Sequence, residues 1–182
     1  MKYFGLKHFL KDDVNEQDFI QEYQNSVEKY LQKKILKKQY KYNVRSQSDV
    51  VSYFQCICTE KDTETVYCIF LNAKNRVITF ERISEGTLTQ CLFYPREIIK
   101  RALKHGALSI VIVHNHPSGS PTPSEADRKV TKKLLFACKE MDIVLLDHMV
   151  IGTDGNGYYS FYEQGLIEQY NAGYRVMSEN QI

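Results

Sequence analysis

The sequence has no long uninterrupted apolar run. No run approaches the roughly 18–20 residues that a membrane-spanning helix requires, which excludes a typical membrane span. The opening residues 1–5 also lack the long apolar core of a secretory signal peptide. We therefore expect a protein with no membrane partner, and the expected compartment is the cytoplasm.

The number of cysteines is odd. The five cysteines are Cys56, Cys58, Cys68, Cys91 and Cys138. An odd number, mostly in apolar surroundings, does not suit a disulfide framework, so we expect small core side chains in a reducing compartment. Cys56 and Cys58 have no second pair at the spacing of a zinc finger, and we expect no cysteine zinc site.

The net charge is low, +2, but it is unevenly spread. Residues 1–45 carry ten basic and six acidic side chains, and residues 29–45 contain no acidic residue at all. The cations of this stretch recur at helical spacing, with tyrosines between them: Lys29, Lys33, Lys34, Lys37, Lys38, Lys41 and Arg45, with Tyr30, Tyr40 and Tyr42. Two interpretations stay open, a nucleic-acid-binding surface and a solvated helix face.

The patterns divide the chain into a helical N-terminal arm, residues 1–45, and a compact domain, residues 46–182. In the arm, apolar residues at mixed helical spacing predict a helix over 13–38. In the domain, the patterns predict a short helix from Ser48, a hairpin over 64–83 with its turn at 72–75, helices over 94–106 and 124–141, buried strands over 107–113 and 143–152, and a short strand with a tail over 158–167. This alternation, beginning with a hairpin, predicts an α/β fold of the α+β kind, with a mixed β-sheet flanked by helices.

The stretch HNHPSGSPTPSEAD, residues 114–127, carries the chemistry. His114 and His116 are two residues apart at the end of a predicted strand, so both imidazoles point to the same side. Asp127 falls in the first turn of the next helix and reaches the same point if the loop folds back. Two imidazoles and one carboxylate, with a fourth position open, are typical of a catalytic zinc site. The alternative is a purely structural role, a strand-to-helix loop in which Ser124 and Asp127 form a capping box.

The order His114-x-His116, seven residues beginning with Pro117, then Ser124-x-x-Asp127 resembles the JAMM signature of JAB/MPN metalloproteases. The words GTLTQCLFYPREIIKRAL, VHNHPSG, PTPSEAD and LLDHMVIG resemble the RadC-like branch of that family. The likeness spans roughly residues 46–167. It implies the MPN/JAB architecture, which is cytidine-deaminase-like, and a Zn²⁺ ion held by His114, His116 and Asp127.

The resemblance also implies two catalytic residues. The family uses a glutamate on an earlier strand as general acid/base, and Glu64, eight residues before Asn72, fits that place. Spacing alone would make Glu64 a solvated carboxylate at a strand end. Ser124 is implied as a donor to the developing oxyanion, although the same hydroxyl is the natural helix cap. Asn72 stands where the family more often has aspartate, and we expect this change to affect the turn and not catalysis.

The implied function is a JAMM-type zinc metallopeptidase that cleaves peptide or isopeptide bonds in a peptide or protein substrate, with a ubiquitin-like tail as one candidate. The alternative is a DNA-associated repair-type protein, a nuclease or accessory factor, that uses the same metal and binds nucleic acid through residues 29–45. Longer RadC-type proteins carry a helix-hairpin-helix region, but residues 1–45 show no Gly-based hairpin of that kind. A binding domain with an inactive site is a third alternative, which the intact motif disfavours. The sequence does not predict the oligomeric state.

Three further histidines, His8, His105 and His148, are candidate site residues. Asp147 and His148 lie on the second buried strand, and two interpretations stay open for them. The pair either supplies a metal ligand or a partner that orients a ligating imidazole, or it is structural and packs under the site. His8 and His105 have no chemical neighbours in the sequence pattern, and we expect surface or capping roles.

Overall fold

The computed structural model describes residues 48–58, 63–86, 93–152 and 157–179. Its elements are α2 (Ser48–Cys58), β1 (Glu64–Leu71), β2 (Val77–Gly86), α3 (Pro95–His105), β3 (Ser109–Asn115), α4 (Glu125–Glu140), β4 (Val144–Ile151), β5 (Tyr158–Ser160) and α5 (Leu166–Glu179). The predicted helix over 13–38, the basic stretch 29–45 and His8 lie outside the described residues. In the described part of the chain, no helix is long and apolar enough to cross a bilayer.

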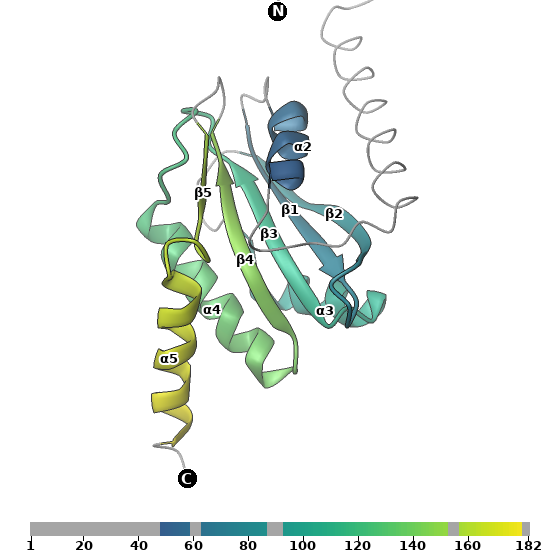
Figure 1. The fold of residues 1–182 in the computed structure, drawn as a ribbon, viewed down its shortest axis with the longest axis vertical. Helices are drawn as coiled ribbons and strands as arrows, with labels where there is room; N and C mark the ends of the chain where they lie inside the picture. Colours follow the sequence, from purple (N-terminus) through teal and green to yellow (C-terminus); the bar gives the residue numbers. More distant parts are fainter. Residues whose placement is uncertain (1–47, 59–62, 87–92, 153–156, 180–182) are drawn as a thin grey trace, which may run out of the picture.

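The five strands form one mixed sheet in the order β2-β1-β3-β4-β5 (Figure 1). β1 pairs antiparallel with both β2 and β3, β3 pairs parallel with β4, and β5 closes the far edge antiparallel to β4. The β1–β2 turn is built by Asn72, whose side-chain oxygen accepts hydrogen bonds from the backbone N–H groups of Lys74 and Arg76 at 2.9 and 3.1 Å. The predicted mixed sheet flanked by helices is therefore confirmed, and the fold is α+β.

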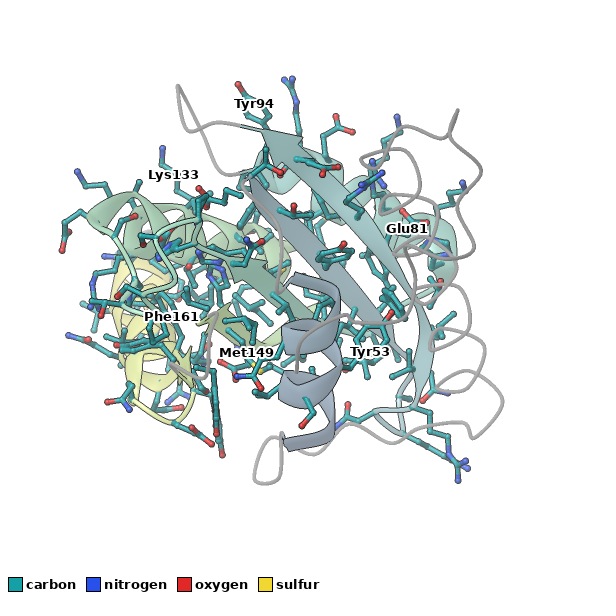
Figure 2. All side chains as sticks on the ribbon, turned by 90° about the horizontal axis from the view of Figure 1, so that it is seen from above. Tyr53, Glu81, Tyr94, Lys133, Met149 and Phe161 are labelled. Carbon is teal, nitrogen blue, oxygen red and sulfur yellow. The ribbon has the colours of Figure 1, made fainter. Side chains whose placement is uncertain are left out.

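Helices cover both faces of the sheet, because alternate residues of each strand point to opposite sides (Figure 1). On one face α2 packs against odd-numbered residues of β1 and β3, among them Tyr67 and Val111. Figure 2 shows Tyr53 of α2 and Met149 of β4 on this side. On the other face, α3 and α4 bury apolar residues against the even-numbered side of the same strands: Ile98, Ala102, Leu134, Leu135 and Cys138 against Cys68, Phe70, Ile110 and Ile112.

Local signals set the ends of the two helices that flank the site. Pro95 occupies the first turn of α3, and Gly106 ends that helix in the left-handed region, with φ 61°, which glycine adopts at little cost. Ser124 caps α4 in a complete capping box with Asp127. The predicted boundaries of both helices are confirmed to within one or two residues.

The prediction for the end of the chain was wrong. The predicted tail after the last strand contains α5, which begins directly after Gly165. Only Ile167 of this helix is buried, so α5 has no broad apolar stripe to mark it in the sequence. Among the predicted strands, β2 extends to Gly86, and β3 begins at Ser109 and continues through Asn115.

Strand pairing determines where the site forms. Because β1 runs antiparallel to β3, the first residues of β1 lie beside the last residues of β3, with Val66 opposite His114. Glu64 and His114 lie on even-numbered positions, which face α3 and α4. Three segments thus meet at one end of the strands: the start of β1, the end of β3 and the first turn of α4.

Candidate metal centre

Four side chains that can bind a metal converge at this end of the strands: Glu64, His114, His116 and Asp127. One ligand atom from each lies within 4.8 Å of every other. The Nε2 atoms of the two histidines are 3.0 Å apart. The Asp127 carboxylate lies 3.7 Å from His114 Nε2 and 3.3 Å from His116 Nε2. Glu64 Oε1 lies 3.9 Å from His114 Nε2, so the structure brings all four predicted residues together.

The Pro- and Gly-rich loop returns the chain to the site. Gly119, with φ 76°, donates its N–H to the His116 carbonyl at 2.9 Å and closes a tight turn. His116 Nδ1 lies 2.9 Å from the carbonyl oxygen of Ser120, across the same turn. The loop then delivers Ser124 to the N-cap of α4, which places Asp127 opposite the two imidazoles.

Ser124 is committed to Asp127 through several bonds. Its Oγ accepts the N–H of Asp127 at 3.1 Å and donates its proton to Asp127 Oδ2 at 2.7 Å. Its backbone N–H donates to the same Oδ2 at 2.6 Å. A serine hydroxyl has one proton, so stabilising an oxyanion would require this proton to leave Asp127. The catalytic role of Ser124 stays a prediction.

Glu64 is a buried carboxylate. The residue is 4% exposed, and among the described residues neither of its oxygens accepts a hydrogen bond. Burial raises the pKa of Glu64 to about 7, and repulsion from Asp127 adds to the shift while His116 opposes it. A carboxyl group with this pKa takes up and releases a proton near neutral pH, which suits a general acid/base.

The amide of Asn115 holds Glu64 in place. Asn115 lies between the two histidines and points to the opposite face of the sheet, where it is fully buried. Its Oδ1 accepts the N–H of Thr65 at 3.0 Å, and its Nδ2 donates to the carbonyl of Thr63 at 3.2 Å. These two backbone groups flank Glu64, so Asn115 fixes the segment that carries the carboxylate.

The protonation states of the other three groups differ with their surroundings. Burial lowers the pKa of His114 well below its usual value, and repulsion from His148 acts in the same direction. For His116 burial also lowers the pKa, but the hydrogen bond and attraction to Asp127 outweigh it and the pKa is raised. For Asp127 burial raises the pKa, yet His116, His114 and Ser124 together hold it far below the usual range. Asp127 is therefore an anion near pH 7.

This donor set fits a divalent metal ion. Two imidazole nitrogens only 3.0 Å apart, beside an ionised carboxylate, attract a cation between them. Imidazole and carboxylate are ligands of Zn²⁺, and the buried Glu64 oxygens supply a further polar wall. The same set of two histidines and one carboxylate also binds Fe(II) in some enzymes. The residues thus form a candidate metal centre, and they do not identify the metal.

The remaining predicted candidates separate clearly. Asp147 points away from the cluster, and its carboxylate accepts the Ser160 hydroxyl at 2.7 Å and the Tyr162 N–H at 2.9 Å, a structural role. His148 lies 2.8 Å from His114 Nδ1 and so contacts a candidate ligand directly. The structural interpretation of the pair thus applies to Asp147, and the interpretation as a partner of a candidate ligand applies to His148.

For His105 a surface or capping role was predicted, but the structure shows that this residue is not isolated. Although it ends α3, it lies 2.7 Å from Glu81 of β2, which also accepts a hydrogen bond from Arg101 at 2.7 Å. The side chain of His105 is 21% exposed, and its ring contacts Phe70. The histidine therefore ties α3 to the sheet edge, away from the candidate metal centre.

Two residues of the site were not predicted. Asn115 stands between two candidate ligands, and alternation along the strand is the signal that puts it on the other face. Thr131 lies one helical turn after Asp127 and contacts His148. The spacing of four residues on a helix was a usable signal for Thr131. Cys68 and Cys138 are buried free thiols, in agreement with the prediction for them.

Comparison with known proteins places the chain in a family. A family model described as "RadC-like JAB domain" matches residues 44–166. A UPF0758 protein of Thiobacillus denitrificans is 48% identical over 120 residues, 66% of this chain and 53% of the relative. One of Symbiobacterium thermophilum is 49% identical over 104 residues, 57% of this chain and 44% of the relative.

A longer match covers more of the chain. A UPF0758 protein of Actinobacillus pleuropneumoniae serotype 5b is 39% identical over 164 residues, 90% of this chain and 69% of the relative. The chain spans about half the length of the first two relatives. The family match covers most of the described domain, including all four residues of the candidate metal centre, and the chain belongs to the RadC-like JAB domain family.

Proposed function

We propose that this protein is a zinc-dependent hydrolase of amide bonds, peptide or isopeptide. The observation that carries the proposal is the convergence of Glu64, His114, His116 and Asp127 within 4.8 Å. The imidazoles of His114 and His116 and the carboxylate of Asp127 would hold the ion. Glu64 lies beside them and accepts no hydrogen bond from the described residues. When bound, the zinc ion would polarise the scissile carbonyl and make water more acidic.

Glu64 performs the proton transfers in this proposal. With a pKa of about 7, its carboxylate accepts a proton from the attacking water and then gives it to the nitrogen of the leaving amine. The water oxygen forms a bond to the carbonyl carbon, the C–N bond breaks, and the products are a carboxylate and an amine. Asn115 holds the backbone on both sides of Glu64, so the carboxylate keeps its place during both transfers.

Metal content is the first experiment. Wild-type protein, His116→Ala and His105→Gln are purified without added metal and measured by elemental mass spectrometry. We expect near-stoichiometric zinc in the wild type and in the His105→Gln control, and loss of zinc from His116→Ala. Iron in place of zinc would change the metal in the proposal, and no metal in the wild type, even after zinc is supplied, would overturn it.

Activity is tested on peptide and isopeptide libraries with the metal-loaded protein. We expect Glu64→Gln to lose activity by about 10²–10⁴-fold, the usual contribution of a general acid/base, while zinc stays bound. Glu168→Gln, an exposed change on α5, is the matched control and keeps activity. If the wild type cleaves nothing and behaves like Glu64→Gln, the hydrolase proposal fails.

The proposed substrate is a peptide or protein segment, for which a ubiquitin-like tail is one candidate. β2 is an edge strand of the sheet, and its last residue, Gly86, pairs with Glu64. A chain that added to this edge as a further strand would therefore run toward the candidate metal centre. A substrate strand added to β2 would form backbone hydrogen bonds with it. Substrate segments that contain proline at alternate positions lack the N–H groups for these bonds, and we expect them to be cleaved more slowly.

A second candidate function is nucleic-acid association. One observation favours it, a hollow of about 640 Å³ between β2 and α3 in which basic side chains outnumber acidic ones. Its lining is Phe80, four basic residues and two acidic residues: Arg82, Lys100, Arg101, Lys104, Glu81 and Glu97. Figure 2 places Glu81 on the side of the molecule opposite Phe161. Fluorescence anisotropy with a labelled oligonucleotide at low salt tests it. Equal binding by wild type and Lys100→Gln/Lys104→Gln, or no binding by the wild type, would exclude this surface as the contact.

A further inference from the structure

A chain of three hydrogen bonds leads from His114 into the core. His114 Nδ1 lies 2.8 Å from His148 Nε2, and His148 Nδ1 lies 2.6 Å from Thr131 Oγ1. Thr131 Oγ1 in turn donates to the main-chain carbonyl of Asp127 at 2.5 Å. The side chains of His114, His148 and Thr131 are fully buried, so water does not compete for these bonds.

The direction of the whole chain follows from its last member. A carbonyl oxygen only accepts, so the proton between Asp127 O and Thr131 Oγ1 belongs to the threonine. That hydroxyl has no second proton, and the bond between His148 and Thr131 must therefore use the proton of His148 Nδ1. A neutral His148 then accepts at Nε2, and His114 must donate from Nδ1. A neutral His114 is thereby left with a lone pair on Nε2.

In its neutral form, His116 adopts the same tautomer through one bond. Its Nδ1 lies 2.9 Å from the carbonyl of Ser120, which again only accepts. The histidine therefore donates from Nδ1 and directs Nε2 to the cluster. Main-chain carbonyl groups thus determine which nitrogen carries the proton in both imidazoles, that of His116 and that of the more deeply buried His114. For His114, the path to a carbonyl runs through His148 and Thr131.

Aromatic contacts hold His148 in the plane that this bridge needs. Its ring stacks on Phe161 with centroids 4.9 Å apart and planes 14° from parallel. Phe93 approaches the edge at 6.1 Å and 70°. Figure 2 shows Phe161 in the layer of α4 and α5. With rotation of the ring restricted, His148 presents one nitrogen to each neighbour.

We propose that His148 and Thr131 are positioning residues: the hydrogen-bond chain anchored on the carbonyl of Asp127 fixes His114 as its Nδ1–H tautomer and holds the Nε2 lone pair toward the candidate metal centre. The metal part of this inference rests on the proposed function, whereas the tautomer is a property of the chain itself. Asp127 thus contributes twice, with its carboxylate as a candidate ligand and with its carbonyl as the origin of the tautomer.

The tautomer is tested by long-range ¹H–¹⁵N NMR of the imidazoles in chelator-treated protein, where the five histidines are assigned with single variants. We expect His114 and His148 as Nδ1–H tautomers in the wild type. Thr131→Val keeps the side-chain shape but removes the acceptor for His148, so we expect the His114 signal to shift toward the Nε2–H tautomer. Thr131→Ser restores the hydroxyl and the wild-type pattern. Thr79→Val, on β2, is the matched control and leaves both signals unchanged.

Zinc affinity is the second readout, measured by competition with a chelator. Loss of an outer hydrogen-bond partner of a ligating histidine typically weakens metal binding 10–100-fold, and we expect a loss of that order for Thr131→Val and recovery in Thr131→Ser. If Thr131→Val binds zinc like the wild type and keeps its tautomers, the inference is wrong even though the protein is a metalloenzyme. If the wild type binds no zinc, the proposed function fails, and the NMR spectra of the chelator-treated protein still decide whether the tautomer is fixed.

Discussion

Among single residues, Glu64 shows most directly how burial, charge and reactivity are linked. An exposed glutamate titrates near 4.5, whereas burial raises the pKa of Glu64 to about 7. The folded protein therefore binds this proton more tightly than the unfolded chain does. Between these two pH values, folding stability falls as pH rises, because the unfolded chain ionises first, and above pH 7 the penalty is fully present.

Glu64→Gln removes this penalty from protein treated with a chelator. We expect the variant to be more stable than the wild type at pH 8, by at most about 3 kcal/mol, since each pKa unit corresponds to roughly 1.4 kcal/mol. At pH 4 the two proteins have equal stability. Urea unfolding at both pH values measures the difference. Glu85→Gln is the control, and an equal response from it would show that Glu64 is not the cause.

Asn115 supports Glu64 from the other face of the sheet. Asn115→Asp keeps the acceptor for the Thr65 N–H but points a buried carboxylate at the Thr63 carbonyl, and we expect a loss of about 2 kcal/mol at pH 7.5. Near pH 4 the new carboxyl binds a proton and donates it to Thr63, so much of the loss should recover. Asn115→Ala removes both bonds and should show no recovery, which urea unfolding at the two pH values would resolve.

The residues differ in how well the sequence predicts them. His114, His116 and Asp127 lie within fourteen residues of one another, so strand alternation and one helix start are enough to bring them together. Glu64 is fifty residues away from His114, and only the family resemblance selected it. The contacts of His148 and Thr131 depend on how β4 lies parallel to β3 and beneath α4, which no local pattern specifies.

At the scale of elements, the N-terminus of α4 joins helix stability to the candidate site. The capping box uses Ser124 and Asp127, and the same Asp127 faces the histidines. Ser124→Ala removes the cap acceptor, and we expect a loss of about 1 kcal/mol in unfolding free energy. Ser118→Ala, at an exposed loop position, is the control and should stay within about 0.5 kcal/mol.

The two proposed roles of Ser124 separate in the same experiment. If the hydroxyl also stabilises an oxyanion, activity falls by about 10²-fold or more, beyond what the small stability loss explains at a temperature where the variant is folded. Ser124→Thr keeps both the cap and the hydroxyl and should retain activity. A loss of stability with full activity in Ser124→Ala would restrict this residue to its capping role.

Elements with strong local signals were predicted, and those without were not. α3 and α4 carry Pro95, Gly106 and the Ser124 cap, and their ends were predicted closely. α5 buries only Ile167 along its length, so no apolar stripe marked it. The continuation of β3 through Asn115 depends on pairing with β4, which reaches Ile151 opposite Asn115. Such pairing partners are set by the tertiary fold and not by local sequence.

At the scale of the whole molecule, the sheet topology assembles a site from segments far apart in sequence. β3 is central, with antiparallel β1 on one side and parallel β4 on the other. The end of β3 therefore meets the start of β1, which brings Glu64, and the end of β4 lies alongside. α4, which follows the loop after β3, returns across the same face with Asp127. A ligand that binds these segments together should stabilise the entire domain.

Zinc is therefore expected to raise the melting temperature of the protein, because it binds the folded chain and the unfolded chain has no assembled site. At a free concentration of about 100 times Kd the gain is about 2.7 kcal/mol, which corresponds to a rise of roughly 5–10 °C in a domain of this size. His116→Ala should lose most of this rise, and His105→Gln, whose histidine lies at the β2–α3 contact, should keep it. Differential scanning calorimetry with chelator and with buffered zinc measures each difference. An equal rise in all three proteins would mean that zinc stabilises the fold from somewhere other than the four converging side chains.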